Sequence, residues 1–170
     1  MKTINSIKSK IFSLTNIKKK VKEWKKEGKT IVFTNGCFDI LHLGHVDYLA
    51  KASSLGDILI IGLNTDASVR NLKGKNRPVN DEKARALLLA AFSFVDAVVL
   101  FNEETPYQLI DKIKPDFLVK GKDYKVKDVV GYDILKVYGG KVKTIKLVEG
   151  YSTSAIEKRI LNLNKYTKNG

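Results

Sequence analysis

Two histidines, His42 and His45, lie three positions apart with Gly44 between them, and they are the only histidines in the 170-residue chain. The segment before them is predicted to be a strand, and both fall in the first turn of a predicted helix, where residues three apart share a face. Free N–H groups and a partial positive charge at a helix N-terminus attract phosphate, and Gly44 lets an anion approach the backbone. The pattern indicates a phosphate site built from imidazoles and backbone amides.

The residues just before the histidines permit other interpretations. The two histidines could form a purely structural pair, or they could join Cys37 and Asp39 in a zinc site. The spacing disfavours zinc because Cys37 and Asp39 precede the helix and need not face the imidazoles. No base is assigned to Cys37, so a nucleophilic role is not favoured either. We expect Cys37 to line a phosphate-binding turn beside Phe38, where backbone N–H groups bind the anion.

Basic side chains follow the second predicted strand. Lys73, Lys75 and Arg77 lie in a stretch punctuated by Gly, Pro and Asn. This stretch is either a solvated basic loop or a flap that clamps phosphate. Arg85 lies inside the next predicted helix, and its position is equally compatible with a surface ion pair and with a phosphate contact.

Apolar patterning predicts strands that alternate with helices. The predicted strands cover 30–35, 58–63, 97–101, 117–120 and 141–147; the predicted helices cover 17–27, 44–55, 81–94 with Asn80 as N-cap, 105–113, 131–138, and a last helix opened by a Ser154/Glu157 capping box. This alternation predicts an α/β fold: a single domain with a Rossmann-like, doubly wound parallel five-stranded sheet in the order 3-2-1-4-5. Ligands bind such sheets beyond the carboxyl ends of the strands, where the order reverses. The histidines follow the first of these strands.

The excess of positive charge is concentrated near the N-terminus. The formal charge is +13, and residues 1–30 hold ten lysines against two acidic residues, whereas the rest of the chain carries 21 basic and 16 acidic groups. We predict a flexible basic arm at 1–16, an N-terminal helix at 17–29, the α/β domain at 30–163 and a disordered tail at 164–170. The mildly basic body weakens a nucleic-acid interpretation and suits a site for small phosphorylated molecules.

Cysteine usage and the apolar runs indicate where the protein works. The single cysteine, Cys37, excludes an internal disulfide framework and is typical of a reducing compartment. The Lys-rich N-terminus lacks the apolar core of a secretory signal. The apolar stretch at 86–101 is interrupted by Asp96 and is too short for a membrane span. We therefore expect a cytoplasmic protein without a membrane partner.

The segment from Thr34 to His45 resembles the H-x-G-H nucleotidyltransferase superfamily, whose members transfer a nucleoside monophosphate from a nucleoside triphosphate to a phosphorylated or acidic acceptor. The resemblance continues at 64–66, 73–80, 119–124 and 149–154. Within the superfamily the chain is similar to the adenylyltransferases that activate D-glycero-β-D-manno-heptose 1-phosphate, which occur alone or as part of a bifunctional kinase. The resemblance implies that ATP and this sugar phosphate give ADP-heptose and pyrophosphate.

The resemblance also implies roles for individual residues. His42 and His45 contact the triphosphate and stabilise the pentacoordinate phosphorus and the leaving pyrophosphate, and no general base is needed because the acceptor is already an oxyanion. The nucleotide is bound by Gly36, Cys37, Phe38, Gly44, Lys120, Gly121, Gly150, Tyr151, Ser152 and Thr153. The phosphate clamp is Lys73, Lys75 and Arg77. The sugar phosphate is bound by Asp39, Asp66, Asp123 and Tyr124, although Asp66 could equally cap the segment after it.

Mg²⁺ is the expected cofactor and should travel with ATP, neutralising its phosphates with few direct protein ligands. No resident metal site is predicted. Relatives are often dimers, and the resemblance implies a homodimer. The Lys-rich N-terminal region is either a solvated helix with a packing stripe or a surface for dimerisation or for an acidic partner. Trp24 on its apolar stripe favours docking onto the body or onto a second subunit.

Two alternative functions remain open. Cytidylyltransferases that act on glycerol 3-phosphate are also similar, but they carry an arginine three residues before the glycine of the last motif, and here that position is Leu147. A basic nucleic-acid-binding protein is suggested by the isoelectric point of about 9.7. The body, however, lacks the basic stripe with interleaved aromatic residues that such binding uses.

Overall fold

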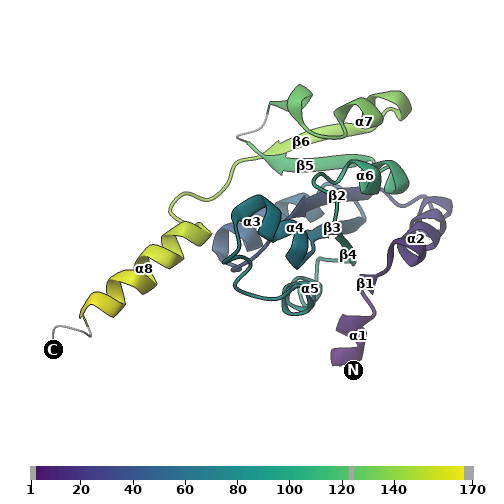
Figure 1. Ribbon diagram of the computed structural model, residues 1–170. Coiled ribbons are helices and arrows are strands. Elements are labelled where there is room, and N and C mark those ends of the chain that lie inside the picture. The colour runs from purple at the N-terminus through teal and green to yellow at the C-terminus, as the bar shows by residue number, and fades with distance from the viewer. Residues whose placement is uncertain (1–2, 123–124, 167–170) are drawn as a thin grey trace.

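The computed structural model describes residues 3–122 and 125–166, in which a parallel sheet is flanked by helices (Figure 1). The strands are β1 (Ile11–Phe12), β2 (Ile31–Gly36), β3 (Ile58–Asn64), β4 (Ala97–Phe101), β5 (Phe117–Gly121) and β6 (Lys141–Ile145). The helices are α1 (Ile4–Lys8), α2 (Leu14–Lys26), α3 (Leu43–Ser53), α4 (Asp66–Lys73), α5 (Glu82–Ala90), α6 (Tyr107–Ile113), α7 (Tyr132–Tyr138) and α8 (Thr153–Tyr166), with a 3₁₀ turn, η1, at Val126–Asp128.

The strand order is β1-β4-β3-β2-β5-β6, and every neighbouring pair is parallel. The five predicted strands are present in the predicted order. The prediction of five strands was nevertheless wrong, because β1 adds a sixth beside β4, pairing Ile11 with Val98 and Phe12 with Val99. A strand of two residues inside a Lys/Ser-rich stretch is too short to show the alternation that identifies a strand.

The first sixteen residues differ from the predicted flexible arm. Within the described part of this segment, α1 and β1 form, and α2 begins at Leu14 rather than Ile17. The side chain of Ser13 caps α2 by accepting a hydrogen bond from the Asn16 amide at 3.2 Å. Docking also stabilises the segment, because the Lys10 ammonium donates to the carbonyls of Phe92 and Val95 in the body.

The apolar stripe of α2 packs onto the protein's own sheet. Ile17, Val21 and Trp24 are buried, and the Trp24 ring meets the edge of Phe12 with centroids 6.4 Å apart. Of the two docking sites suggested for Trp24, the structure shows the body of the same chain. Burial of such side chains contributes about 1.5 to 3 kcal/mol each.

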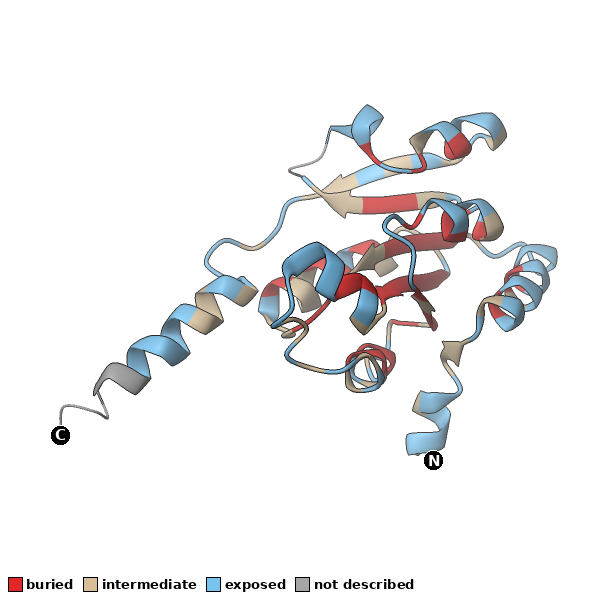
Figure 2. Ribbon diagram, in the orientation of Figure 1, coloured by how far each residue is buried: buried red, intermediate tan, exposed pale blue. Residues whose placement is uncertain are grey.

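Two apolar cores lie on the two faces of the sheet (Figure 2). One core is filled by α2, α6 and α7, with Ile110 and Leu135 among its buried side chains. The other is filled by α3 and α5, with Leu49 and Leu89 among its members. The strands between them are buried on both sides, most fully β3. Their uninterrupted apolar character is typical of a parallel sheet covered on both faces.

Several helix ends differ from the prediction. Helix α4 was missed because it is short and polar, and Thr65 caps it. Asp81, not Asn80, is the N-cap of α5. The hydroxyl of Ser152 accepts from the Ala155 amide at the start of α8, so the predicted cap at Ser154 was wrong.

Helix α8 projects away from the sheet in Figure 1 and is mostly exposed in Figure 2. It extends to residue 166 and so includes the start of the predicted tail at 164–170, whose last four residues lie outside the described part. Among residues 3–122 and 125–166, no helix has both the length and the apolar character needed to cross a bilayer.

Candidate active site

The turn after β2 is held in shape by an aromatic ring. Phe38 has a positive φ of 45° and is buried, which is uncommon for a bulky residue. A side chain at Gly36 would place its Cβ 3.0 Å from the Phe38 ring. The ring in turn meets His45 edge-on, with centroids 5.2 Å apart. The turn therefore fixes one face of the second histidine.

The two imidazoles are stacked at the N-terminus of α3. Their ring centroids lie 3.8 Å apart at an interplanar angle of 24°. His42 is the N-cap residue but makes no side-chain capping bond, so the first amides of the helix have no acceptor from it. The Nδ1 atoms of both rings are buried and have no hydrogen-bond partner among the described residues. This geometry leaves the first amides of α3 available to an anion, beside two imidazoles whose Nδ1 atoms make no hydrogen bond in the described part of the chain.

Burial keeps both imidazoles neutral near pH 7. Desolvation lowers the pKa of His42. Desolvation, assisted by the nearby His42 and Lys73, lowers the pKa of His45 to about 4. The positive potential of the site therefore comes from lysines and helix amides before any ligand arrives.

Gly44 allows the segment before α8 to pass close to the histidines. A Cβ at this position would lie 3.1 Å from the His42 ring and 3.3 Å from the carbonyl oxygen of Tyr151. The predicted motifs around His42 and Tyr151 are thus in contact although they are more than one hundred residues apart. This approach also brings Thr153, the first residue of α8, to the site.

The histidine turn opens into a hollow of about 230 Å³. Its walls come from the ends of β2 and β5, from the segments that follow β2 and β6, from α3 and α4, and from the start of α8. They consist of Asn35, Gly36, Cys37, Phe38, Asp39, His45, Tyr48, Lys73, Lys120, Gly121, Leu147 and Thr153. Most of the residues predicted to bind nucleotide therefore converge here. Lys73 of the predicted clamp also lines the hollow, at the end of the missed helix α4.

Asn35 and Tyr48 are wall residues that the sequence did not single out. The Lys120 ammonium donates to Asn35 Oδ1 at 2.5 Å, which joins β5 to β2 across the hollow. The Tyr48 hydroxyl lies 2.8 Å from Thr34 Oγ1. Both lie on elements that carry the motif, and proximity in the chain to the histidines was the available signal.

The carboxylate of Asp39 lines the hollow, but it is hydrogen-bonded to the loop at 74–80. One carboxylate oxygen accepts from Arg77 Nη1 at 2.9 Å, and the other accepts from the amides of Val79 and Asn80. Arg77 also pairs with Glu157 on α8. The observed partners of Arg77 are thus two carboxylates, and the residue connects the β2 turn to the last helix.

Arg85 is completely buried, so the surface ion pair considered for it was wrong. Its guanidinium donates to the carbonyls of Cys37, Asn64 and Asn80 at 2.7 to 2.9 Å and to Asp66 Oδ1 at 2.7 Å. These four bonds tie the histidine turn, the end of β3 and the 74–80 loop together. The available signal was its place on the apolar stripe of α5, four residues before the buried Leu89.

Other predicted residues lie around the hollow or away from it. Asp66 accepts from Arg85 and lines a larger hollow of about 570 Å³ with Thr65, Ala67, Arg70, Asp81, Glu82, Lys83 and Asn102. We place the site at the smaller hollow because His45, which stacks on His42, lines it at the N-terminus of α3. Lys75 is exposed, Gly150 has a φ of 81°, and Ser152 caps α8. The predicted sugar ligands Asp123 and Tyr124 lie outside the described residues.

The four residues considered as zinc ligands are not arranged to coordinate a metal, although Cys37, Asp39 and His45 line the same hollow. Across residues 3–122 and 125–166, no group of three or more His, Cys, Asp and Glu side chains is arranged to hold a metal ion. Cys37 instead points its thiol toward Asn64 at 3.9 Å, and Asp39 is taken up by the 74–80 loop. Burial raises the pKa of the Cys37 thiol, which weakens the nucleophilic reading further.

The sheet order and the histidine turn define a nucleotidyltransferase-type α/β domain, and residues 33–159 match the cytidylyltransferase-like family. The chain belongs to that family. Its relatives include the "Bifunctional protein HldE" of Wolinella succinogenes, 57% identical over 89% of this chain and 31% of that protein. The protein of the same name from Nitratiruptor sp. is 60% identical over 82% of this chain and 29% of that protein. The chain thus spans about a third of the length of these curated relatives.

Two solved structures support the same fold. The lipopolysaccharide core biosynthesis protein of Thermoplasma volcanium has 33% sequence identity and a TM-score of 0.60, covering 74% of this chain and all of that one. Pantoate-beta-alanine ligase of Francisella tularensis has a TM-score of 0.58 at 17% identity, covering 85% of this chain and 68% of that one. The second likeness concerns the fold alone.

Proposed function

We propose that the protein transfers the adenylyl group of ATP to D-glycero-β-D-manno-heptose 1-phosphate and releases pyrophosphate. The observation that carries the proposal is the pair of stacked imidazoles with unpartnered Nδ1 atoms at the uncapped N-terminus of α3. The identity of 57 to 60% with the HldE proteins supports the choice of acceptor. The product would serve the assembly of surface glycans.

The reaction needs position and compensating charge more than acid–base chemistry. An oxygen of the sugar phosphate bonds to the α-phosphorus of ATP while the bond to the bridging oxygen of pyrophosphate breaks, and no proton has to be removed. Negative charge then accumulates on the α-phosphoryl and the leaving group. His45, Lys73 and Lys120 line the hollow, and together with His42, which stacks on His45, and the amides of α3 they would supply donors to that charge.

The remaining wall residues hold the substrates. Gly36 and Gly121 end β2 and β5 and let phosphates approach the backbone. Thr153 offers a hydroxyl at the N-terminus of α8. Asp39 acts by fixing the 74–80 loop through Arg77, whereas Asp123 and Tyr124 stay predicted contacts of the sugar.

Mg²⁺ fits this donor set as a companion of the nucleotide. The charged side chains on the described walls of the hollow are Lys73, Lys120 and Asp39, and the Asp39 carboxylate is already engaged by three donors. Such walls suit a metal held by the oxygens of the triphosphate itself. When bound, the ion neutralises phosphate charge.

We also propose a homodimer that works in the cytoplasm. Ile160, Leu161 and Leu163 are exposed on the projecting helix α8, and contiguous exposed apolar side chains mark interaction sites. The cytoplasmic location rests on the need for ATP and on the single cysteine. Light scattering on the purified protein tests the dimer, and replacement of Leu161 and Leu163 by glutamate should yield monomers.

A screen of pyrophosphate release across ATP, CTP, GTP and UTP, each with a panel of sugar and polyol phosphates, tests the proposed reaction. We expect turnover with ATP and heptose 1-phosphate to exceed every other pair. Leu147 lines the hollow at the position where the cytidylyltransferases that act on glycerol 3-phosphate carry arginine. This difference supports ATP over CTP as the substrate. Preferred turnover of CTP with glycerol 3-phosphate would overturn the proposal. Tight oligonucleotide binding without any nucleotidyl transfer would also overturn it.

A further inference from the structure

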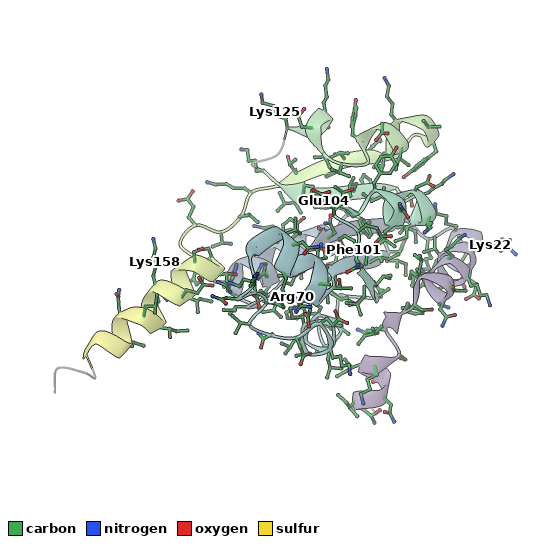
Figure 3. All side chains as sticks on the ribbon, in the orientation of Figure 1. Lys22, Arg70, Phe101, Glu104, Lys125 and Lys158 are labelled. Carbon is green, nitrogen blue, oxygen red and sulfur yellow. The ribbon has the colours of Figure 1, made fainter. Side chains whose placement is uncertain are left out.

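A second hollow, of about 400 Å³, lies between α2 and α6, which pack against each other. Two apolar residues, Val21 and Ile113, also line it. All its other wall residues are lysines: Lys18, Lys22, Lys25, Lys26, Lys112 and Lys114. We call these six residues the lysine groove. Figure 3 shows Lys22 on the outer side of α2, at the opposite end of the molecule from Lys158 on α8.

The positive charge of the lysine groove is not neutralised by acidic side chains in the described walls of the same hollow. No acidic side chain lines it among the described residues. Glu23, on the same helix, pairs with Lys20 instead. The Lys25 ammonium donates to the Lys114 carbonyl at the end of α6. Burial lowers the pKa of Lys25, and the Lys114 charge lowers it further against the opposing effect of Asp116.

Helix capping explains only part of this cluster. Cations near the end of a helix offset its dipole, and Lys25 serves α6 in that way. Lys18 and Lys22 lie in the second and third turns of α2, where the dipole gives no such benefit. Their convergence with Lys112 on one hollow therefore needs another reason.

The lysine groove lies near the N-terminal ends of the central strands, whereas the histidine site lies at their C-terminal ends. The helices α2 and α6 lead into the first residues of β2 and β5, whereas the histidine turn follows the last residue of β2 and Gly121 is the last residue of β5. Because β2 has six residues, the two ends of the strand are about 20 Å apart. The groove thus cannot share the nucleotide of the proposed reaction.

We propose that the lysine groove binds an acidic segment of another protein. Lys18, Lys22 and Lys26 follow one another at about 6 Å along α2. Alternate side chains of an extended peptide repeat at nearly the same interval, about 6.6 Å. A run with Asp or Glu at every second position therefore matches the groove in charge and in spacing. The proposal is independent of the reaction at the histidine site.

Other anionic partners fit less well. Among the residues that the structure describes, no arginine and no aromatic residue lines the groove, and these are the side chains that nucleic-acid surfaces use for forked phosphate contacts and for stacking. Val21 and Ile113 are buried, so the groove offers no apolar wedge for insertion into a bilayer. An acidic peptide requires neither feature.

The test measures fluorescence anisotropy of a synthetic peptide with glutamate at every second position, titrated with the full-length protein. We expect salt-sensitive binding that weakens about tenfold or more when Lys18, Lys22, Lys26 and Lys112 are all changed to glutamine. The matched control changes four exposed lysines elsewhere, Lys8, Lys127, Lys136 and Lys143, to glutamine and should bind within about twofold of the wild type. A triple variant that keeps the half-buried Lys112 should show most of the loss if the fourfold variant folds poorly.

Three results would overturn the proposal. The first is equal loss in the groove variant and in the control, which would show that only net charge matters. The second is absence of peptide binding to the wild type at low salt. The third is tighter, groove-dependent binding of a single-stranded oligonucleotide or of vesicles rich in anionic lipid. Pyrophosphate release should be unchanged in the groove variant, which separates this test from the proposed reaction.

Discussion

The guanidinium of Arg85 and the carboxylate of Asp66 meet at 2.7 Å, and the arginine is completely shielded from water. The same guanidinium also holds the Cys37 carbonyl of the histidine turn. A buried cation is tolerated only where all its donors find acceptors. The pair therefore links the shape of the nucleotide turn to the end of β3, although Arg85 does not line the proposed nucleotide hollow.

Replacement of Arg85 by methionine should reduce the free energy of unfolding by about 3 to 5 kcal/mol, because three carbonyls and a carboxylate lose their donor. Urea unfolding followed by circular dichroism measures the change. The matched control is Arg70→Met on the exposed face of α4 (Figure 3), where we expect a loss within about 0.5 kcal/mol. Equal losses in the two variants would refute the positioning role of Arg85.

Replacement of His42 or His45 by asparagine should lower kcat by about 10² to 10³, because each removes a donor directed at the charge of the transition state. Pyrophosphate release under saturating ATP measures the effect. Lys51→Gln on the exposed side of the same helix is the control and should leave kcat unchanged. Circular dichroism should show that all three variants fold. Nearly normal turnover in either histidine variant would contradict its assigned role.

Arg77 should hold α8 in place through Glu157. Glu157→Gln removes the charge that attracts Arg77, and we expect faster hydrogen exchange in residues 147–156 together with a higher KM for ATP. The adjacent Lys158→Gln, whose side chain points outward on α8 in Figure 3, should leave both unchanged. Exchange rates that are the same in the two variants would mean that the ion pair does not anchor the helix.

His45 should make stability depend on pH. Its pKa is about 4 in the folded protein against an ordinary value of 6.5, so the unfolded chain binds the proton more readily. The free energy of unfolding is thus unaffected by His45 above pH 6.5 and falls as the pH drops from 6.5 toward 4. His45→Gln should recover about 1 to 2 kcal/mol of this loss at pH 4.5, a range reduced because the ring is not fully removed from water. Chemical denaturation of both proteins at pH 7 and 4.5 tests this. The prediction is contradicted if the free energy of unfolding falls by the same amount between these pH values in the wild type and in His45→Gln.

The order of the sheet could be predicted because its five main strands are apolar and each crossover carries a helix. The strand β1 could not, because Ile11 and Phe12 acquire strand character only by pairing with β4. The short helix α4 escaped prediction for a related reason, since its sequence is polar and its cap, Thr65, resembles any turn residue. Local pattern identifies long elements, whereas short ones depend on tertiary contacts.

The candidate site was predictable where chemistry is encoded in residue type and spacing, as for His42 and His45. His45 converges with Lys73, Lys120 and Thr153 because parallel strands all end at the same side of the sheet and the segments that follow them meet there. The partners of Arg77 and Arg85 could not be predicted, because the sequence shows that a side chain is charged but not how deeply it is buried. The extent of burial decides whether a guanidinium contacts solvent, a phosphate or a carbonyl group.

The family match begins at Phe33, yet the apolar stripe of α2 closes one face of the sheet and β1 borders β4. A fragment excised at Phe33 would lose the Ile17 and Trp24 side chains and would bare the β4 edge. Bared edges of this kind recruit strands from other molecules. We therefore expect the cooperative unit of this protein to start upstream of the segment shared by its family, at the lysine-rich residues that form β1 and α2.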